Sequence, residues 1–244
     1  MTSNTPISRY PEIDLLRGVA VLGMILFHAA FDWVFFAGQQ LELDSGIIWA
    51  IGRSAAAIFV ALAGCSMGLA WRRKHAGKKS PLLMRGVQIF GMGIALTAFT
   101  WIFFNAYTIW FGVLHLIGLG VIIGTLLLLY PRSTLLTGII ITGLGIALSL
   151  PSLSAWTPAI IPLFPVAIQT FDYFPLFPWL GLFFLGMSVG EYLYPSGRQR
   201  YRISFNTTHP ITQSLIWAGR NSLLIYFIHQ PILVGIILLM GGAV

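Results

Sequence analysis

The chain has 244 residues, of which 57% are hydrophobic and 9% are charged, with 26 Gly and 8 Trp. This composition excludes a water-soluble domain and favours a polytopic helical membrane protein, because no soluble core of this size needs so much apolar surface. The net charge of +7 does not indicate a nucleic-acid partner, since the basic residues gather at the ends of apolar segments.

Seven apolar segments have the length of membrane helices and leave no room for a separate soluble domain. We therefore expect a single membrane domain over residues 1–244, folded as an all-α bundle of about seven transmembrane helices. The first apolar run lacks a plausible signal peptidase site, so we expect it to be retained as the first helix. The predicted helices lie near residues 13–36, 46–71, 83–104, 109–130, 133–150, 174–194 and 212–240.

Lys and Arg are distributed unequally between alternate loops. The connections 37–45, 105–108 and 151–173 contain neither residue. The positive-inside rule then predicts a multi-pass protein of the cell membrane with a cytoplasmic N-terminus and an extracytoplasmic C-terminus. The basic loop residues on the side of Arg9 are Arg72, Arg73, Lys74, Lys78, Lys79, Arg85, Arg132, Arg198, Arg200 and Arg202.

The first predicted helix carries ionisable residues on one face. At 100° per residue, its charged positions and its histidine fall within a sector of about 60°. The polar residues of this face are Asp14, Arg17, His28 and Asp32. Arg17 and His28 are about 16 Å apart along the axis, so His28 lies deep in the apolar layer. A charge at that depth is costly unless it is paired or hydrated, and it therefore indicates a functional site.

Two structural alternatives stay open for this face. Asp14 and Arg17 are three residues apart, which also suits an ion pair within one helix at the membrane interface. His28 and Asp32 are four apart, which also suits a buried hydrogen-bonded couple.

Later segments add polar residues at the same predicted outer level. Arg53 in the second span either reaches the lipid headgroups or turns towards Asp32. His115 in the fourth span is either a hydrogen-bonded packing residue or part of a site. Because His28, Asp32, Arg53 and His115 come from three spans and project to one level, a shared polar cavity explains them economically.

Residues 151–175 form the one long outer connection, and five prolines make a continuous helix there unfavourable. We expect a re-entrant or interfacial lid over the cavity. Asp172 in this segment is either a solvated loop acid or a residue of the cavity rim. In the last span, Ser222 and His229 share a face, whereas Arg220 points away from His229.

Arg17 and His28 form the pattern R-x10-H, preceded by EIDLLRG and followed by Phe31-Asp32. This stretch resembles the opening of two transmembrane acyltransferase families, the acyltransferase-3 group and the heparan-alpha-glucosaminide N-acetyltransferase catalytic group. Three later segments are similar to the second group, so the likeness covers most of the chain. These segments are FVALAGCSMGLAWRR, FPWLGLFFLGMSVG and GRNSLLIYFIHQPI.

The resemblance implies an enzyme that moves an acetyl or other acyl group from a cytoplasmic acyl-CoA to a hydroxyl or amine of a sugar-like acceptor. An imidazole suits this chemistry independently, as a base for the acceptor or as an acyl carrier. We expect His28 to take this part, with Asp32 holding its ring. The expected donor-binding residues are Arg17, Arg72, Arg73 and Lys74, and the expected acceptor-binding residues are Arg53, His115, Asp172 and His229.

The named families usually have more spans than the seven expected here. A minimal enzyme, completion of the site by a homodimer, or a relative without activity would each account for the difference. The single cysteine, Cys65, excludes an intramolecular disulfide and offers no thiolate cluster, so we expect no metal. The partners that we expect are membrane lipids, acyl-CoA and the acceptor.

Two other functions fit the same polar residues. A proton-coupled carrier would use the His/Asp/Arg cluster as a relay, although the chain lacks the paired halves that many transporters show. A b-type cytochrome would bind haem between two of His28, His115 and His229.

Overall fold

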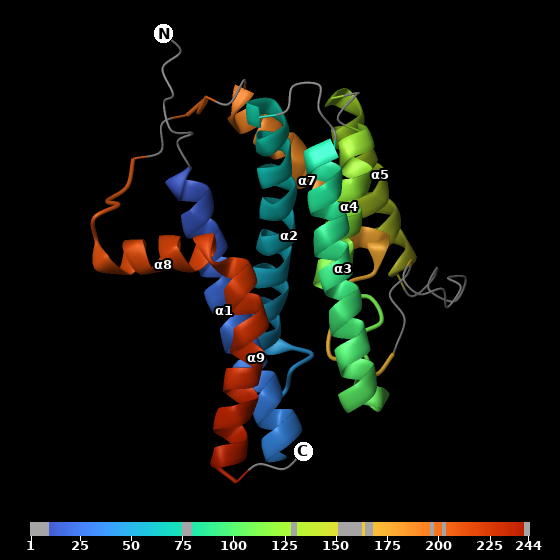
Figure 1. Ribbon diagram of the computed structural model, residues 1–244, viewed down its shortest axis with the longest axis vertical. Helices are drawn as coiled ribbons and strands as arrows, with labels where there is room; N and C mark the ends of the chain where they lie inside the picture. The colour runs from blue at the N-terminus through green and yellow to red at the C-terminus, as the bar shows by residue number, and fades with distance from the viewer. Residues whose placement is uncertain are drawn as a thin grey trace. The chain divides into compact units, whose positions relative to one another are not determined.

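The structure is a computed structural model that describes residues 10–74, 80–127, 131–150, 163, 168–195, 198–201 and 204–241. Regular structure in these ranges is helical, apart from one isolated bridge between Phe111 and Tyr173. The α-helices, labelled in Figure 1, are α1 Pro11–Ala37, α2 Gly46–Lys74, α3 Ser80–Phe103, α4 Val113–Leu127, α5 Pro131–Leu148, α7 Leu176–Leu193, α8 Pro210–Arg220 and α9 Ser222–Leu239. The 3₁₀ turn η1, Asn105–Tyr107, lies between α3 and α4 in the chain. The all-helical prediction is confirmed for these residues.

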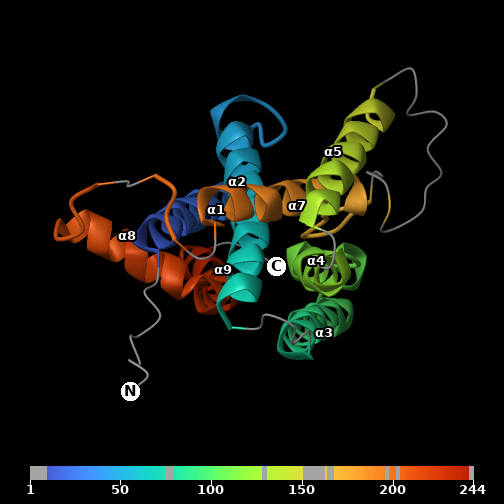
Figure 2. The ribbon, with the colours of Figure 1, turned by 90° about the horizontal axis from the view of Figure 1, so that it is seen from above.

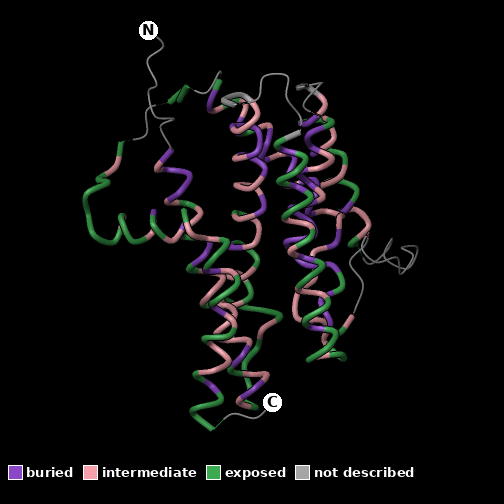
Figure 3. The backbone as a smooth tube through the Cα atoms, in the orientation of Figure 1, coloured by how far each residue is buried: buried purple, intermediate pink, exposed green. Residues whose placement is uncertain are grey.

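Five of these helices, α1, α2, α3, α7 and α9, are long and apolar enough to cross a membrane. α4 and α5 are shorter apolar helices. Many large apolar side chains stay exposed, such as Ile102 on α3 and Ile236 on α9, and Figure 3 shows exposed residues along the length of most helices. Exposed apolar surface of this extent suits lipid rather than water. The count of seven spans and the orientation of the termini remain predictions.

Local sequence fixes both ends of α1. Pro11 occupies the first turn, where its missing N–H is not needed, and Glu12 and Asp14 place acidic groups beside the helix N-terminus. Gly38 ends the helix in the left-handed conformation, with φ of 64°, which only glycine adopts without cost. The ionisable face of α1 therefore belongs to one uninterrupted helix.

The predicted last span, 212–240, is divided into two helices. Asn221 leaves helical geometry, and its side-chain amide donates to the carbonyl of Trp217 at 2.9 Å, which closes the end of α8. α8 has 11 residues and is about 16 Å long, too short to cross a bilayer. It lies crosswise to α1, whereas α9 runs alongside α1 (Figure 1). The membrane-crossing part of this segment is thus α9.

The chain forms two compact units, which divide α2 between Phe59 and Val60. Unit 1 contains the described residues of 10–59 and 204–241, which form α1, the first part of α2, α8 and α9. Its helices approach closely where side chains are absent: a Cβ on Gly18 would collide with the Leu215 carbonyl of α8. A Cβ on Gly219 would likewise collide with the Asp14 carbonyl of α1.

Unit 2 contains residues 60–74 of α2, together with α3, η1, α4, α5 and α7. Figure 2 shows α3 beside α4 and α5 beside α7. The centre of the unit is α7, whose Phe183, Phe184 and Met187 are fully buried. The predicted lid, residues 151–175, falls mostly outside the described residues. In its last part, the Phe171 N–H donates to the Tyr107 carbonyl at 3.2 Å. The prediction of one domain over 1–244 remains a prediction.

Candidate functional site

Two histidines of unit 1 meet across neighbouring helices. His28 lies on α1 and His229 on α9, and 2.8 Å separates Nδ1 of His28 from Nε2 of His229. The ring centroids are 4.9 Å apart. His229 is buried, whereas His28 is partly exposed. The structure therefore joins two of the predicted site residues by a direct ring-to-ring contact.

The orientation of His229 is set by its own helix. Its Nδ1 lies 3.0 Å from the carbonyl oxygen of Ile225 and 2.8 Å from that of Tyr226. Both oxygens belong to the preceding turn of α9, so the ring is held against the backbone. Nε2 is then left to face His28.

Asp32 lies one turn beyond His28 on α1 and is completely buried. The amide of Gln230, the neighbour of His229 on α9, donates to Asp32 Oδ1 at 3.2 Å. Asp32 Oδ2 and Gln230 Oε1 are both buried and have no hydrogen-bond partner among the described residues. The His28 ring thus contacts His229, and the Asp32 carboxylate contacts Gln230.

The same α1 face carries a second polar cluster near its N-terminus. The Asp14 carboxylate accepts from Arg17 Nη1 at 3.3 Å and from Arg220 Nε at 3.1 Å. Arg17 also lies 3.5 Å from the Gly219 carbonyl. The predicted pairing of Asp14 with Arg17 is therefore present, and Arg220 joins it. Two guanidinium groups face the Asp14 carboxylate, and Glu12 adds a second buried acid in the same turn of α1.

An apolar groove of about 770 Å³ lies between these two clusters in unit 1. It is lined from α1 by Gly18, Val21, Leu22 and Ile25, with residues of α8 and Ile225 of α9 opposite. Val21 and Ile25 precede His28 by seven and three residues, so they share its face of α1. The groove thus follows α1 from the level of Arg17 towards that of His28.

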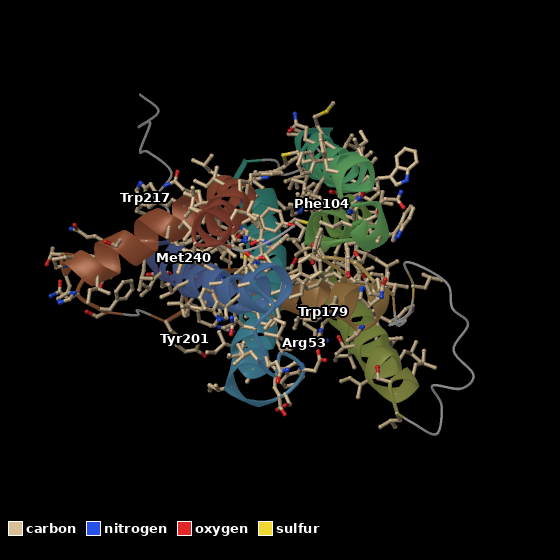
Figure 4. All side chains as sticks on the ribbon, turned by 90° about the horizontal axis from the view of Figure 1, so that it is seen from below. Arg53, Phe104, Trp179, Tyr201, Trp217 and Met240 are labelled. Carbon is tan, nitrogen blue, oxygen red and sulfur yellow. The ribbon has the colours of Figure 1, made fainter. Side chains whose placement is uncertain are left out.

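A second pocket, of about 540 Å³, lies beside α8 and is lined by Arg220 together with Pro11, Thr207, Gln213, Ile216 and Trp217. Figure 4 labels Trp217 on this helix. Gln213 and Trp217 line both the pocket and the apolar groove. The two hollows therefore flank α8, and the second presents a guanidinium.

Arg53 lies on the first part of α2 and is exposed (Figure 4). Its guanidinium carbon is 6.0 Å from the centre of the Trp49 ring, one turn away on the same helix. This distance suits a cation–π contact near the membrane surface. The side chains of Arg72, Arg73 and Lys74 lie outside the described residues.

His115 and Asp172 come together in unit 2, at the beginning of α4. The Gly112 N–H donates to His115 Nδ1 at 3.2 Å, and His115 Nε2 lies 3.4 Å from Thr97 Oγ1. Asp172 Oδ2 accepts from the Val113 N–H at 2.9 Å. These contacts satisfy N–H groups that the first turn of a helix leaves without partners, and they favour the structural alternative for both residues.

The predicted cavity of His28, Asp32, Arg53 and His115 draws on both units and remains a prediction. Sequence reasoning missed Gln230 and the pairing of Arg220 with Asp14. The sequence His229-Gln230 indicates a polar pair on one helix, but the hydrogen-bond partner of Gln230, Asp32, lies 198 residues away in the chain. Among the described residues, no group of three or more His, Cys, Asp or Glu is arranged to hold a metal ion.

Comparison with known families matches residues 9–231 to the model of the heparan-alpha-glucosaminide N-acetyltransferase catalytic domain. The matched range contains every candidate site residue named above. No curated protein and no solved structure matches the chain. The match, together with the long apolar helices, indicates a membrane acetyltransferase.

Proposed function

We propose that this chain, which belongs to the heparan-alpha-glucosaminide N-acetyltransferase catalytic family, transfers an acetyl group from a cytoplasmic acyl-CoA to a hydroxyl or amine of a sugar-like acceptor in or across the membrane. The observation that carries the proposal is the partly buried imidazole of His28, held on one side by a buried partner. An imidazole held at one nitrogen keeps the other for proton or acyl transfer.

In the direct mechanism, the acceptor oxygen or nitrogen attacks the thioester carbonyl while His28 takes the acceptor's proton. The new C–O or C–N bond forms as the C–S bond breaks, and the leaving thiolate then receives a proton. In the covalent alternative, the His28 nitrogen attacks the thioester carbonyl, and a C–N bond to His28 forms as the C–S bond breaks and the CoA thiolate leaves and takes a proton. The acceptor then attacks the acetyl carbonyl, the C–N bond to His28 breaks, and the freed imidazole nitrogen takes the acceptor's proton. Both routes need the reacting nitrogen of His28 to be unprotonated at the start.

The donor is proposed to bind along α1. Guanidinium groups are suited to phosphate, and Arg17 and Arg220 supply two of them beside one carboxylate. The extended thioester arm would occupy the apolar groove, because that groove follows α1 from the Arg17 level towards the His28 level. Arg72, Arg73 and Lys74 remain proposed as further cationic contacts on the same side of the membrane.

The acceptor is proposed to approach from the side of His28 that His229 does not cover. Asp32 Oδ2 and Gln230 Oε1, one turn away, are buried without a hydrogen-bond partner among the described residues, and an acceptor hydroxyl or amine that enters between α1 and α9 would donate to them. Arg53 remains a proposed acceptor contact at the exposed surface of α2. His115 and Asp172 are assigned instead to the support of α4, because they accept hydrogen bonds from the Gly112 and Val113 N–H groups at its beginning.

Incubation of the protein in lipid nanodiscs with labelled acetyl-CoA and a panel of amino sugars and alcohols tests the proposal. We expect release of free CoA that depends on the acceptor, together with a labelled product. His28→Ala should remove both, whereas His209→Ala, an exposed histidine of unit 1, should leave both unchanged. If wild-type protein releases no CoA over the whole panel but transports solutes in proteoliposomes, the carrier function replaces this proposal.

A further inference from the structure

The partner atoms of His229 fix where its proton lies. Carbonyl oxygens only accept hydrogen bonds, and Nδ1 of His229 lies within 3.0 Å of the oxygens of both Ile225 and Tyr226. Nδ1 must therefore carry the proton. In a neutral ring the other nitrogen then has a lone pair, so Nε2 of His229 is an acceptor.

This assignment passes to the next ring. Nδ1 of His28 lies 2.8 Å from Nε2 of His229, a hydrogen-bond distance, so a proton must lie between the two nitrogens. With both rings neutral and Nε2 of His229 accepting, that proton belongs to Nδ1 of His28. Nε2 of His28 is then the nitrogen with the free lone pair. The backbone of α9 thus determines the tautomer of a ring on α1.

We infer that His229 is a positioning residue that directs the basic nitrogen of His28, Nε2, towards the reacting groups, an inference that rests on the proposed function. The relay runs from two carbonyls of α9, through the His229 ring, to the His28 ring. His229 takes the role of the acid in a Ser-His-Asp triad, with a neutral imidazole in place of the carboxylate.

The same contact stabilises the charged form of His28 during the reaction. When Nε2 of His28 takes the acceptor's proton, the ring becomes an imidazolium and still donates from Nδ1 to His229. That hydrogen bond is then charge-assisted and stronger than the neutral one. Because His229 is buried, its lone pair faces His28 without competition from bulk water.

His229 therefore differs from the acceptor-binding residue that the sequence suggested. Both of its ring nitrogens lie within hydrogen-bonding distance of protein atoms, two carbonyls on one side and His28 on the other. Its effect on catalysis would pass through His28, without contact with the substrate.

The inference is tested by ¹⁵N NMR of protein labelled at its five histidines, in nanodiscs at about pH 8, where an ordinary imidazole is neutral. The His28 signals are identified by their loss in His28→Gln. We expect the wild-type His28 ring to be protonated at Nδ1 and unprotonated at Nε2. A wild-type ring protonated at Nε2 would overturn the inference, and this measurement needs no variant of His229 to fold.

A pair of variants separates positioning from packing. Gln places an oxygen near the position of His229 Nε2 and can accept from His28, whereas Leu fills a similar volume without an acceptor. We expect His229→Leu to lower kcat by at least about tenfold and to shift the proton on His28, and His229→Gln to restore most of the loss. Equal losses in both variants, with the His28 tautomer unchanged, would reduce His229 to a packing residue.

The NMR result also distinguishes this inference from the proposed function. If His28 has the expected tautomer and His229→Leu changes it, but wild-type protein transfers no acetyl group, the relay is present and the proposed reaction is wrong. If wild-type protein is active but the tautomer is the opposite one, the reaction stands and the relay is wrong.

Discussion

His28 in unit 1 and His115 in unit 2 are both imidazoles on apolar helices, but their surroundings differ. Both ring nitrogens of His115 contact neighbouring polar atoms of its own unit, at Gly112 and Thr97. Among the described residues, His28 makes a hydrogen bond at one ring nitrogen, and its partner is another imidazole. Its neighbour Asp32 keeps one buried oxygen without a partner among the described residues.

The difference separates a structural role from a chemical one. At the beginning of α4, His115 and Asp172 accept hydrogen bonds from backbone N–H groups that have no partner within the helix. Removing either side chain leaves one of these N–H groups without an acceptor. Between α1 and α9, polar side chains pair with one another and leave acceptor capacity for a ligand. Burial of a histidine alone does not distinguish these cases, whereas the partners of its two nitrogens do.

The largest expected effect is that of His28→Ala on acetyl transfer. Loss of a general base or acyl carrier lowers kcat by about 100-fold or more. The stability of the protein should also fall, by about 1–3 kcal/mol, because the substitution leaves the buried Nε2 of His229 without its partner. Acceptor-dependent CoA release measures the first quantity and thermal unfolding in nanodiscs the second. A His28 variant that unfolds early while its folded fraction stays fully active would reverse the assignment of roles.

His115→Leu should lower stability without a large loss of kcat. The substitution leaves the Gly112 N–H without its acceptor, which costs about 1–3 kcal/mol of stability. Cys65 is buried in unit 2, so the rate at which it reacts with a thiol probe reports opening of that unit. We expect faster labelling of Cys65 in His115→Leu than in wild type. Normal labelling combined with a large loss of kcat would instead place His115 in the reaction.

The helices themselves were predictable because each is a long apolar run, and such runs form helices whatever their neighbours are. The division of the last segment was not predicted. The polar run Gly219-Arg220-Asn221-Ser222 marks the boundary, but it is short and lies between apolar residues, so we read 212–240 as one span. At the break, the Asn221 side chain donates to the Trp217 carbonyl, a local contact that hydropathy does not record.

The candidate site was predictable where it lies within one helix. The helical period alone placed Arg17, His28 and Asp32 on one face of α1. Their partners could not be found in the same way, because His229, Gln230 and Arg220 approach α1 from residues about 200 positions later. Which of several polar residues meet depends on how helices pack, and α8 crosses α1 at glycines that carry no chemical signal of their own.

Arg17→Gln tests whether the Arg17 guanidinium near the start of α1 binds the donor. Gln keeps a polar side chain of useful length but loses the charge, so we expect the KM for acetyl-CoA to rise by about tenfold, with kcat less affected. The control is Arg200→Gln, which removes a cation that lies 4.3 Å above the Tyr192 ring. If both variants raise KM equally, the effect reflects general attraction of an anionic substrate, and Arg17 has no specific part in binding.

The smallest predicted effect is at Asp172, and it separates a helix cap from a site residue. Asp172→Ala removes the acceptor of the Val113 N–H and should cost about 1 kcal/mol of stability. Asp172→Asn keeps a side-chain oxygen at the same place and loses only the charge beside the helix N-terminus, so its cost should be a few tenths of a kcal/mol. Cys65 labelling measures both variants, and Asp44→Ala, an exposed loop acid of unit 1, is the control. If Asp172 binds the acceptor, both Asp172 variants should change KM without this graded loss of stability. The order of the two variants in stability therefore decides whether Asp172 is a helix cap or a site residue.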